Sequence, residues 1–174
     1  TEPAQARATS DYASYGGDGG RQYVPAARIT ATNVGTLKPP WSYHTGDVSS
    51  GSAEVHSASS FQNTPLLVNG TLYICTPFNR VVALDPATDA EFWSYDPEIQ
   101  LKAHYSNQLV CRGISYWGDD EKAADQSCAT KIFTATNDTR LIALDAETGE
   151  LCSDFGIAGM VDTSRGVEES SVYR

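Results

Sequence analysis

Four cysteines are the residues of this chain with the most specific chemistry. None belongs to a Cys-x-x-Cys pair, which argues against a zinc site or a thioredoxin-type centre. An even number suits two disulfides in an oxidising compartment, although buried free thiols are an alternative. Three pairings are open, and Cys111 with Cys128 is the simplest, because these two flank a polar loop from Tyr116 to Ser127. The cysteines are Cys75, Cys111, Cys128 and Cys152.

The basic side chains indicate no metal or nucleic-acid site. The histidines, His44, His56 and His104, are unclustered and lack metal-ligand spacing, so we expect them on the surface or in loops. Lysines and arginines are scattered singly through a chain of formal net charge −10. Nucleic-acid binding needs clustered cations, so this class is excluded and the acidic balance indicates solubility.

Length and composition are those of a globular chain. It has 174 residues, 40% of them hydrophobic, which is enough for one ordinary domain with a core. No apolar run approaches the roughly 18 residues that a membrane helix needs. The polar start, residues 1–11, is expected to be a flexible tail.

A sequence repeat with an offset of 60 residues predicts the strands that would position any functional site. Arg80 matches Arg140, and the following Val-Val-Ala-Leu-Asp matches Leu-Ile-Ala-Leu-Asp. Each copy is predicted to form a strand, a turn, a second strand and another turn: Leu72–Thr76 and Val81–Leu84 in the first, residues 131–135 and 141–144 in the second. A further strand starts at Trp93.

Short strands repeated at this spacing indicate an all-β propeller, a solenoid or a sandwich. A propeller is favoured, because the repeat is long enough for a four-stranded blade of about 40 to 50 residues. The excess length falls in a loop predicted over residues 96–130. A propeller closes with at least about four blades, whereas this chain holds roughly two and a half. We therefore expect residues 12–174 to be the N-terminal blades of a propeller that is truncated at its C-terminus.

The pattern Ala83-x-Asp85-x-x-Thr88-x-x-x-x-Trp93 resembles the tryptophan-docking motif of quinoprotein dehydrogenases. In that motif the Trp packs between blades, and the Asp and Thr close a turn. Asp89 replaces the usual Gly, and Ser153 replaces Trp in the second copy. Three more stretches extend the resemblance over about residues 12–162. Tyr15-Gly16-Gly17-Asp18 resembles the opening segment of the family, and residues 41–47, which begin Trp-Ser-Tyr, resemble the strand after it. Cys111-Arg112-Gly113, with residues 64–76, resembles the membrane-type glucose dehydrogenase branch.

The resemblance implies a partial eight-bladed β-propeller that binds pyrroloquinoline quinone (PQQ), a flat quinone with three carboxylates. Arg112 matches an arginine that binds PQQ, and a guanidinium can hold a carboxylate by two bonds. The alternative is a surface ion pair with the acidic residues 119–121. Thr136 matches a threonine that hydrogen-bonds the cofactor, although an ordinary strand threonine is the alternative.

Two expected site positions depart from the family. Gln62 stands where relatives often have a Glu that contacts PQQ, and an amide keeps the hydrogen bonds without the charge. Gln108 stands where the glucose-specific branch often has a His tied to sugar recognition. The departure at Gln108 suggests a polyol, a cyclitol or another aldose as substrate.

By the same resemblance, an Asp acts as base and a bound Ca²⁺ polarises the quinone, but both belong to later blades. The chain alone is therefore expected to be inactive without its remaining blades. Ubiquinone or another acceptor would take the electrons. The location would be periplasmic, with membrane association through missing segments. Alternatives are a non-catalytic propeller scaffold for protein–protein interaction and a short stand-alone open sheet stack.

Overall fold

The computed structural model describes residues 12–16, 28–105, 107–119, 121–123 and 126–165. The predicted tail over residues 1–11 and the remainder of the opening motif after Gly16 lie outside the described residues. Within them the structure is all-β, as predicted, apart from one turn of 3₁₀ helix, η2 (Val34–Thr36). No helix in this part of the chain has the length and apolar character to cross a bilayer.

The first sheet contains β1 (Leu66–Val68), β2 (Thr71–Cys75), β3 (Val81–Leu84) and β4 (Glu91–Tyr95), in that order and antiparallel. β2, β3 and the strand at Trp93 confirm the predicted strands. Asn69 and Gly70 join β1 to β2 with φ of 49° and 79°, the left-handed conformation that a tight hairpin needs. One register shift between Ala83 and Leu84 interrupts the ladder to β4.

The second sheet repeats this order with β5 (Ser115–Gly118), β6 (Thr130–Ala135), β7 (Arg140–Asp145) and β8 (Met160–Asp162). β5 lies inside the region predicted as loop, so that prediction was wrong over residues 115–118. The reason is that β5 is largely exposed, with a single partner strand, β6, and therefore carries no apolar run.

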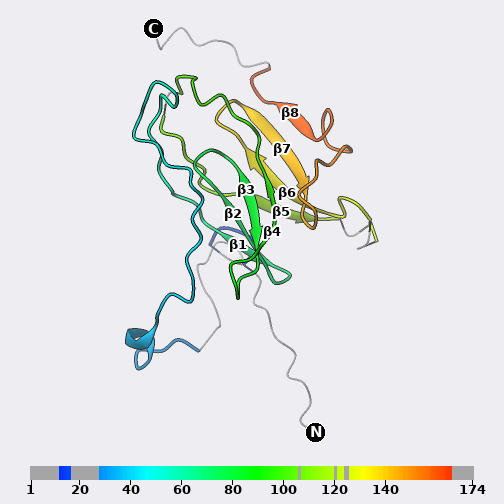
Figure 1. Cartoon of the computed structure of the whole chain (residues 1–174). Coiled ribbons are helices and arrows are strands. Elements are labelled where there is room, and N and C mark those ends of the chain that lie inside the picture. Colours follow the sequence, from blue (N-terminus) through cyan, green and yellow to red (C-terminus); the bar gives the residue numbers. More distant parts are fainter. Residues whose placement is uncertain (1–11, 17–27, 106, 120, 124–125, 166–174) are drawn as a thin grey trace.

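The two sheets lie side by side, with a core between them (Figure 1). Alternation along each strand sends Tyr73 and Ala83 toward the second sheet and Ile74 and Val82 to the opposite face of the first. The core between the sheets contains Leu66, Val68, Tyr73, Cys75, Val81, Ala83, Cys111, Ile114, Ile132, Ile142, Leu144 and Ala146.

Trp93 joins the sheets as the docking motif predicts. Its indole Nε1 donates to the carbonyl of Ala146 at 3.1 Å, and the Tyr73 hydroxyl donates to the same carbonyl at 3.0 Å. The Asp85 carboxylate accepts from the Ala87 amide and the Thr88 hydroxyl, which confirms the predicted turn closure. Asp89 is left-handed, with φ of 61°, at the position where the second copy has Gly149.

Residues 41–47 form no strand, although a strand was expected there by resemblance. They have no ladder partner among the described residues, yet they repeat the contacts of β4. The indole Nε1 of Trp41 donates to the carbonyl of Pro86 at 3.1 Å, the counterpart of the Trp93 bond. Tyr43 packs on Ile74, Val82 and Leu84, so this segment covers the outer face of the first sheet.

Candidate cofactor site

The candidate site forms where two segments meet, each of which leads into the first strand of a sheet. The chain before β1 and the chain before β5 run side by side: Leu109 donates to Ala58, Ser60 to Leu109, and the Thr64 amide to the Arg112 carbonyl at 3.0 Å. These bonds bring residues 58–64 against residues 109–112, about 50 positions later. Gln62 and Arg112 therefore come together at one cavity.

Gln62 and Arg112 line one open cavity of about 710 Å³. Arg112 is exposed and makes no ion pair within the described part of the chain, so the proposed pairing with residues 119–121 is not seen for Asp119 or Glu121. Its guanidinium remains available to an anion. The cavity is lined by Tyr15, Gln62, Thr64, Leu66, Arg112, Gly113, Ile114 and Ser115.

The lining fits part of a flat, carboxylated quinone. One free guanidinium suits a carboxylate, the Gln62 amide and the hydroxyls of Thr64 and Ser115 offer hydrogen bonds, and the exposed ring of Tyr15 offers a stacking surface. Tyr12 exchanges two backbone hydrogen bonds with Leu67 of β1, and this places Tyr15 at the rim. These residues can bind and orient a cofactor, but their described lining includes no carboxylate to act as a base.

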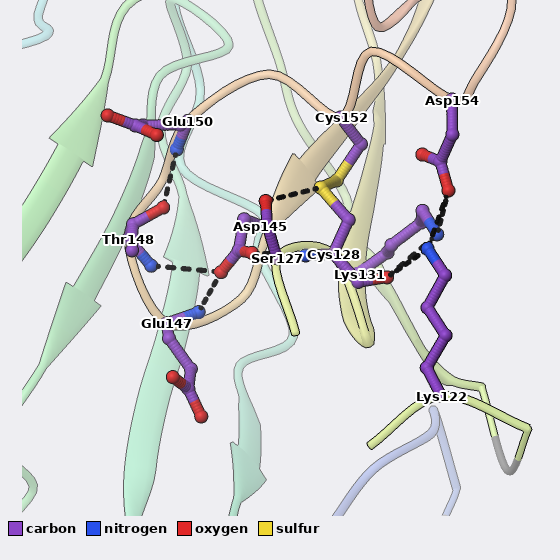
Figure 2. Close-up of a disulfide and its surroundings, with 10 residues drawn as sticks. All are labelled: Lys122, Ser127, Cys128, Lys131, Asp145, Glu147, Thr148, Glu150, Cys152 and Asp154. Carbon is purple, nitrogen blue, oxygen red and sulfur yellow. Dashed lines mark hydrogen bonds and ion pairs between the residues drawn. A yellow bond between two sulfur atoms is a disulfide. The ribbon is translucent and has the colours of Figure 1, made fainter. Parts of the chain in front are cut away.

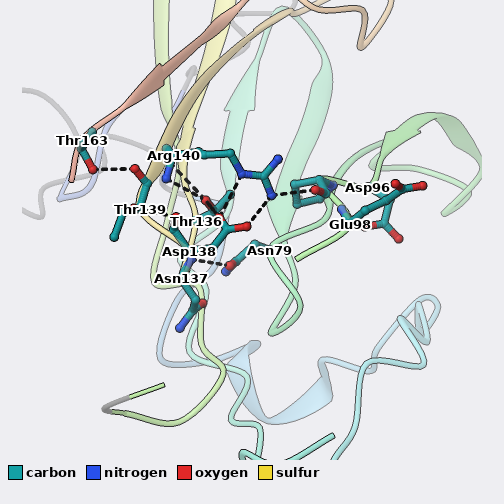
Figure 3. A network of polar contacts seen from close by, with 10 residues as sticks. Asn79, Asp96, Glu98, Thr136, Asn137, Asp138, Thr139, Arg140 and Thr163 are labelled. Atoms are coloured by element: carbon teal, nitrogen blue, oxygen red, sulfur yellow. Dashed lines mark hydrogen bonds and ion pairs between the residues drawn. The ribbon is translucent and has the colours of Figure 1, made fainter. Parts of the chain in front are cut away.

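Thr136 is not among the described residues that line this cavity. Its hydroxyl contacts the Asp138 carboxylate and accepts the Arg140 backbone N–H at 3.1 Å, while the same carboxylate pairs with the Arg140 guanidinium at 2.7 Å (Figure 3). Thr76 accepts the Arg80 amide in the same way in the first sheet. The observed contacts of Thr136 are thus those of a residue that closes a turn.

The Arg140 guanidinium also reaches the Pro97 carbonyl, at 2.7 Å, and so ties the second sheet to the end of the first (Figure 3). Burial raises the pKa of Asp138, but hydrogen bonds from Arg140 and Thr136 outweigh it and leave that pKa below its ordinary value. Arg80 makes the equivalent contacts with Asp47 and the Thr45 carbonyl. These matched ion pairs are structural and repeat with the sheets.

Gln108 is exposed and is likewise not among the described residues lining the cavity, although Leu109 beside it is fully buried. Its backbone N–H donates to the Asn107 Oδ1 at 2.8 Å. The structure therefore places Gln108 next to the segment that carries Arg112, outside the described lining of the cavity.

The predicted pairing of Cys111 with Cys128 was wrong. Cys75 bonds to Cys111, and Cys128 bonds to Cys152. Cys111 lies in the core between the sheets, where the end of β2 is its neighbour, whereas Cys128 lies on the far face of the second sheet with Ala143. One signal in the sequence could have identified the partner of Cys75. This cysteine ends a predicted strand of the repeat, so burial of its side chain, and therefore a buried partner cysteine, could have been expected.

The second disulfide lies beside an ion-pair cluster rather than a metal site (Figure 2). Cys128, Cys152 and Asp154 form the one group of metal-ligand side chains found among the described residues. Both sulfurs are already bonded to each other, and Asp154 pairs with Lys122 at 2.8 Å and Lys131 at 3.2 Å. This cluster therefore has no free donor set for a metal.

Two of the histidines lie together, whereas the sequence suggested that all three are unclustered. The rings of His56 and His104 stack with their centroids 4.3 Å apart, because the His56 amide donates to the Leu101 carbonyl and brings the two loops together. Both are exposed loop residues, as expected. No third metal-ligand side chain joins them within the described residues.

Known proteins match this chain over nearly its whole length. The family described as glucose/ethanol/alcohol dehydrogenase, β-propeller domain (PQQ) matches residues 12–173. Quinoprotein glucose dehydrogenase of Escherichia coli is 36% identical over 89% of this chain and 20% of its own length. The glycerol dehydrogenase large subunit of Gluconobacter oxydans is 35% identical over 94% of this chain and 22% of its own length.

A solved structure gives the same result. The crystal structure of quinohemoprotein alcohol dehydrogenase from Comamonas testosteroni superposes with a TM-score of 0.67 at 27% identity, covering 95% of this chain and 21% of the other. The chain thus spans about one fifth of the length of these relatives. The two four-stranded sheets are blades of a β-propeller, and the chain belongs to the family of PQQ-dependent quinoprotein dehydrogenases.

Proposed function

We propose that this chain forms part of the cofactor-binding wall of a PQQ-dependent dehydrogenase that oxidises a hydroxyl of a sugar or polyol. The observation that carries the proposal is Arg112, whose guanidinium lines a cavity with Gln62 and has no ion-pair partner among the described residues. PQQ, when bound, accepts the two electrons of alcohol oxidation.

In this proposal the chain's own residues bind and orient. The Arg112 guanidinium holds a cofactor carboxylate, the Gln62 amide donates to a cofactor oxygen, and the Tyr15 ring covers the edge of the cavity. Thr136 contributes by holding its turn through Asp138 and Arg140. The proton-accepting Asp and the Ca²⁺ ligands are assigned to blades outside these residues, which is consistent with the absence of a carboxylate from the described lining.

The substrate is proposed to be a polyol, a cyclitol or an aldose other than glucose, with ubiquinone or another quinone as acceptor. Support comes from Gln108, which replaces the expected His, and from relatives named for glucose, glycerol and quinate/shikimate oxidation. We also propose a periplasmic location, because two disulfides persist best in an oxidising compartment.

The test is reconstitution of the intact protein with PQQ, followed by quenching of tryptophan fluorescence. Arg112→Ala is expected to weaken PQQ binding by about tenfold or more, since a charged hydrogen bond to a carboxylate contributes at least about 1.5 kcal/mol. The matched control is Arg165→Ala, because Arg165 is exposed and pairs only weakly with Asp162 at 3.4 Å. Equal effects of both variants would refute the role of Arg112.

Catalysis is tested separately with the same protein and a panel of glucose, glycerol and quinate. The intact protein is expected to oxidise glycerol or quinate faster than glucose with an artificial quinone acceptor. The 174-residue chain alone, with PQQ and Ca²⁺ added, is expected to oxidise none. Turnover by the isolated chain would contradict the assignment of the base and metal ligands to other blades.

A further inference from the structure

The Cys75–Cys111 disulfide forms part of the support of the cavity wall. Cys75 ends β2 of the first blade, and Cys111 immediately precedes Arg112 in the chain that leads into β5 of the second. The bond joins residues 36 positions apart with their Cα atoms 5.8 Å from each other. Both half-cystines are buried, at 0% and 5% exposed. The disulfide therefore ties the Arg112 backbone to the end of an inner strand of the other blade.

On its other side, this segment pairs with residues 58–64 through backbone hydrogen bonds. The Thr64 amide donates to the Arg112 carbonyl at 3.0 Å, and residues 58–60 pair with Leu109. The Arg112 side chain has no ion pair among the described residues that would fix it independently. The position of the Arg112 guanidinium in the cavity therefore depends on how the backbone of residues 109–112 is anchored.

Asn63 connects the same disulfide to the other wall. Its Nδ2 donates to the Cys75 Sγ at 3.1 Å, and its Oδ1 is buried without a partner in the described structure. Asn63 lies between Gln62 and Thr64, which both line the cavity. The Cys75–Cys111 disulfide thus contacts both segments that are proposed to bind the cofactor, the one that carries Gln62 and the one that carries Arg112.

We infer that the Cys75–Cys111 disulfide is a positioning element, which sets Arg112 and Gln62 at a fixed separation for the carboxylated quinone. This inference rests on the proposed function, because it assigns the disulfide a role in that same site. Loss of the bond lets residues 109–112 move and weakens cofactor binding through Arg112.

The chain offers a matched control. Cys128–Cys152 also closes a loop, of 24 positions, and is buried, but its neighbours are Ala143, Phe133 and Phe155 on the far face of the second blade. Neither half-cystine is among the described residues that line the cavity. Removal of either disulfide costs stability through the unfolded chain, so only the first removal should also affect the site.

The experiment measures the PQQ dissociation constant of the intact protein by fluorescence quenching, with native folding verified by circular dichroism. The variants are Cys75→Val/Cys111→Ala, Cys128→Val/Cys152→Ala, Arg112→Ala and the combination of the first with the third. A Cys75→Ser/Cys111→Ser variant repeats the comparison with different packing, should the Val/Ala pair fail to fold.

We expect loss of Cys75–Cys111 to raise the PQQ Kd about tenfold and loss of Cys128–Cys152 to change it less than about twofold. In the Arg112→Ala background, loss of Cys75–Cys111 should add less than about threefold, because the part of the effect exerted through Arg112 is already removed and only the part exerted through Gln62 remains. If the disulfide had a purely structural role, the factors by which its loss and Arg112→Ala raise the PQQ Kd would multiply in the combined variant. That result would overturn the inference, and so would equal effects of the two disulfides on the Kd. Wild-type protein that binds no PQQ refutes the proposed function itself.

Discussion

Trp93 and Ala146 belong to different blades, and the indole Nε1 of Trp93 donates a 3.1 Å hydrogen bond to the Ala146 carbonyl. The Trp93 ring is partly buried against the core between the sheets and lies tilted to the Tyr73 ring, 5.9 Å between centroids. It therefore combines apolar packing with one directional contact at the interface between the blades.

Trp93→Ala is expected to lower the free energy of unfolding by about 3 kcal/mol, because it removes the packing and leaves a cavity. Trp93→Phe, which keeps most of the packing and loses the hydrogen bond, should cost about 1 kcal/mol. Urea titration monitored by circular dichroism measures both. The control is Trp117→Ala on β5, which is 45% exposed and should cost less than about 1 kcal/mol. A cost for Trp117→Ala as large as that for Trp93→Ala would contradict this assignment.

Gly149 is required by the same interface. Its φ is +75°, and an added Cβ would lie 2.6 Å from the Trp93 ring. Gly149→Ala should therefore destabilise the protein by about 2 kcal/mol or more, from left-handed strain and the clash together. Asp89→Gly, at the equivalent position of the first blade, should change stability by less than about 1 kcal/mol. Thermal melts of the two variants compare them, and a neutral Gly149→Ala would show that the ring can move aside.

The Asp138–Arg140 pair predicts an acid-sensitive contribution to stability. The pKa of Asp138 in the folded protein lies below its ordinary value of 3.8, because the Arg140 and Thr136 hydrogen bonds outweigh the effect of burial. The ionised carboxylate thus stabilises the fold at pH values above 3.8, and this contribution is lost as the pH falls through the lowered pKa.

Asp138→Asn should accordingly cost about 1 kcal/mol at neutral pH and progressively less below pH 4. Denaturant titrations from pH 7 to pH 3 test this. Arg140→Gln is the companion variant, and the double variant should be little worse than either single one. A cost for Asp138→Asn that is the same at pH 7 and pH 3 would exclude a role for the charge.

Tyr43 should titrate only at very alkaline pH. Burial and the hydrogen bond to the Glu91 carboxylate, at 2.7 Å, together raise its pKa to about 12. The neutral phenol therefore stabilises the fold below pH 10, and this contribution is lost as the pH rises toward 12. In an ultraviolet titration of tyrosinate, Tyr43→Phe should remove the latest step and Glu91→Gln should move it earlier. An unchanged curve for Glu91→Gln would show that the carboxylate is not responsible.

The repeated parts of the fold were the predictable ones. β2, β3, β6 and β7 are apolar runs bounded by turns, so their residues carry a strand signal without tertiary information. β5 has no such signal because it is largely exposed on one edge. The docking role of Trp93 was implied by the resemblance of residues 83–93 to the tryptophan-docking motif, and the strand signal alone does not reveal it.

The candidate site was less predictable, since it is assembled from segments far apart in the sequence. Arg112 and Gln62 meet only because residues 58–64 pair with residues 109–112, and no local pattern encodes that pairing. The disulfide partners depended on which face of each sheet a cysteine occupies. Thr136 had the right residue type, but its hydroxyl is engaged by Asp138 and Arg140, a local geometry that residue type alone does not reveal.

The bond from Trp41 to Pro86 and the bond from Trp93 to Ala146 are the same contact made twice in succession. A contact repeated with equal geometry applies an equal rotation at every step, so each unit is turned by the same angle relative to the one before it. Such an array closes into a ring when the repeated rotation completes a full turn, and winds as an open helix when it does not. The rotation between neighbouring units is therefore set locally, by where an indole N–H meets a turn carbonyl.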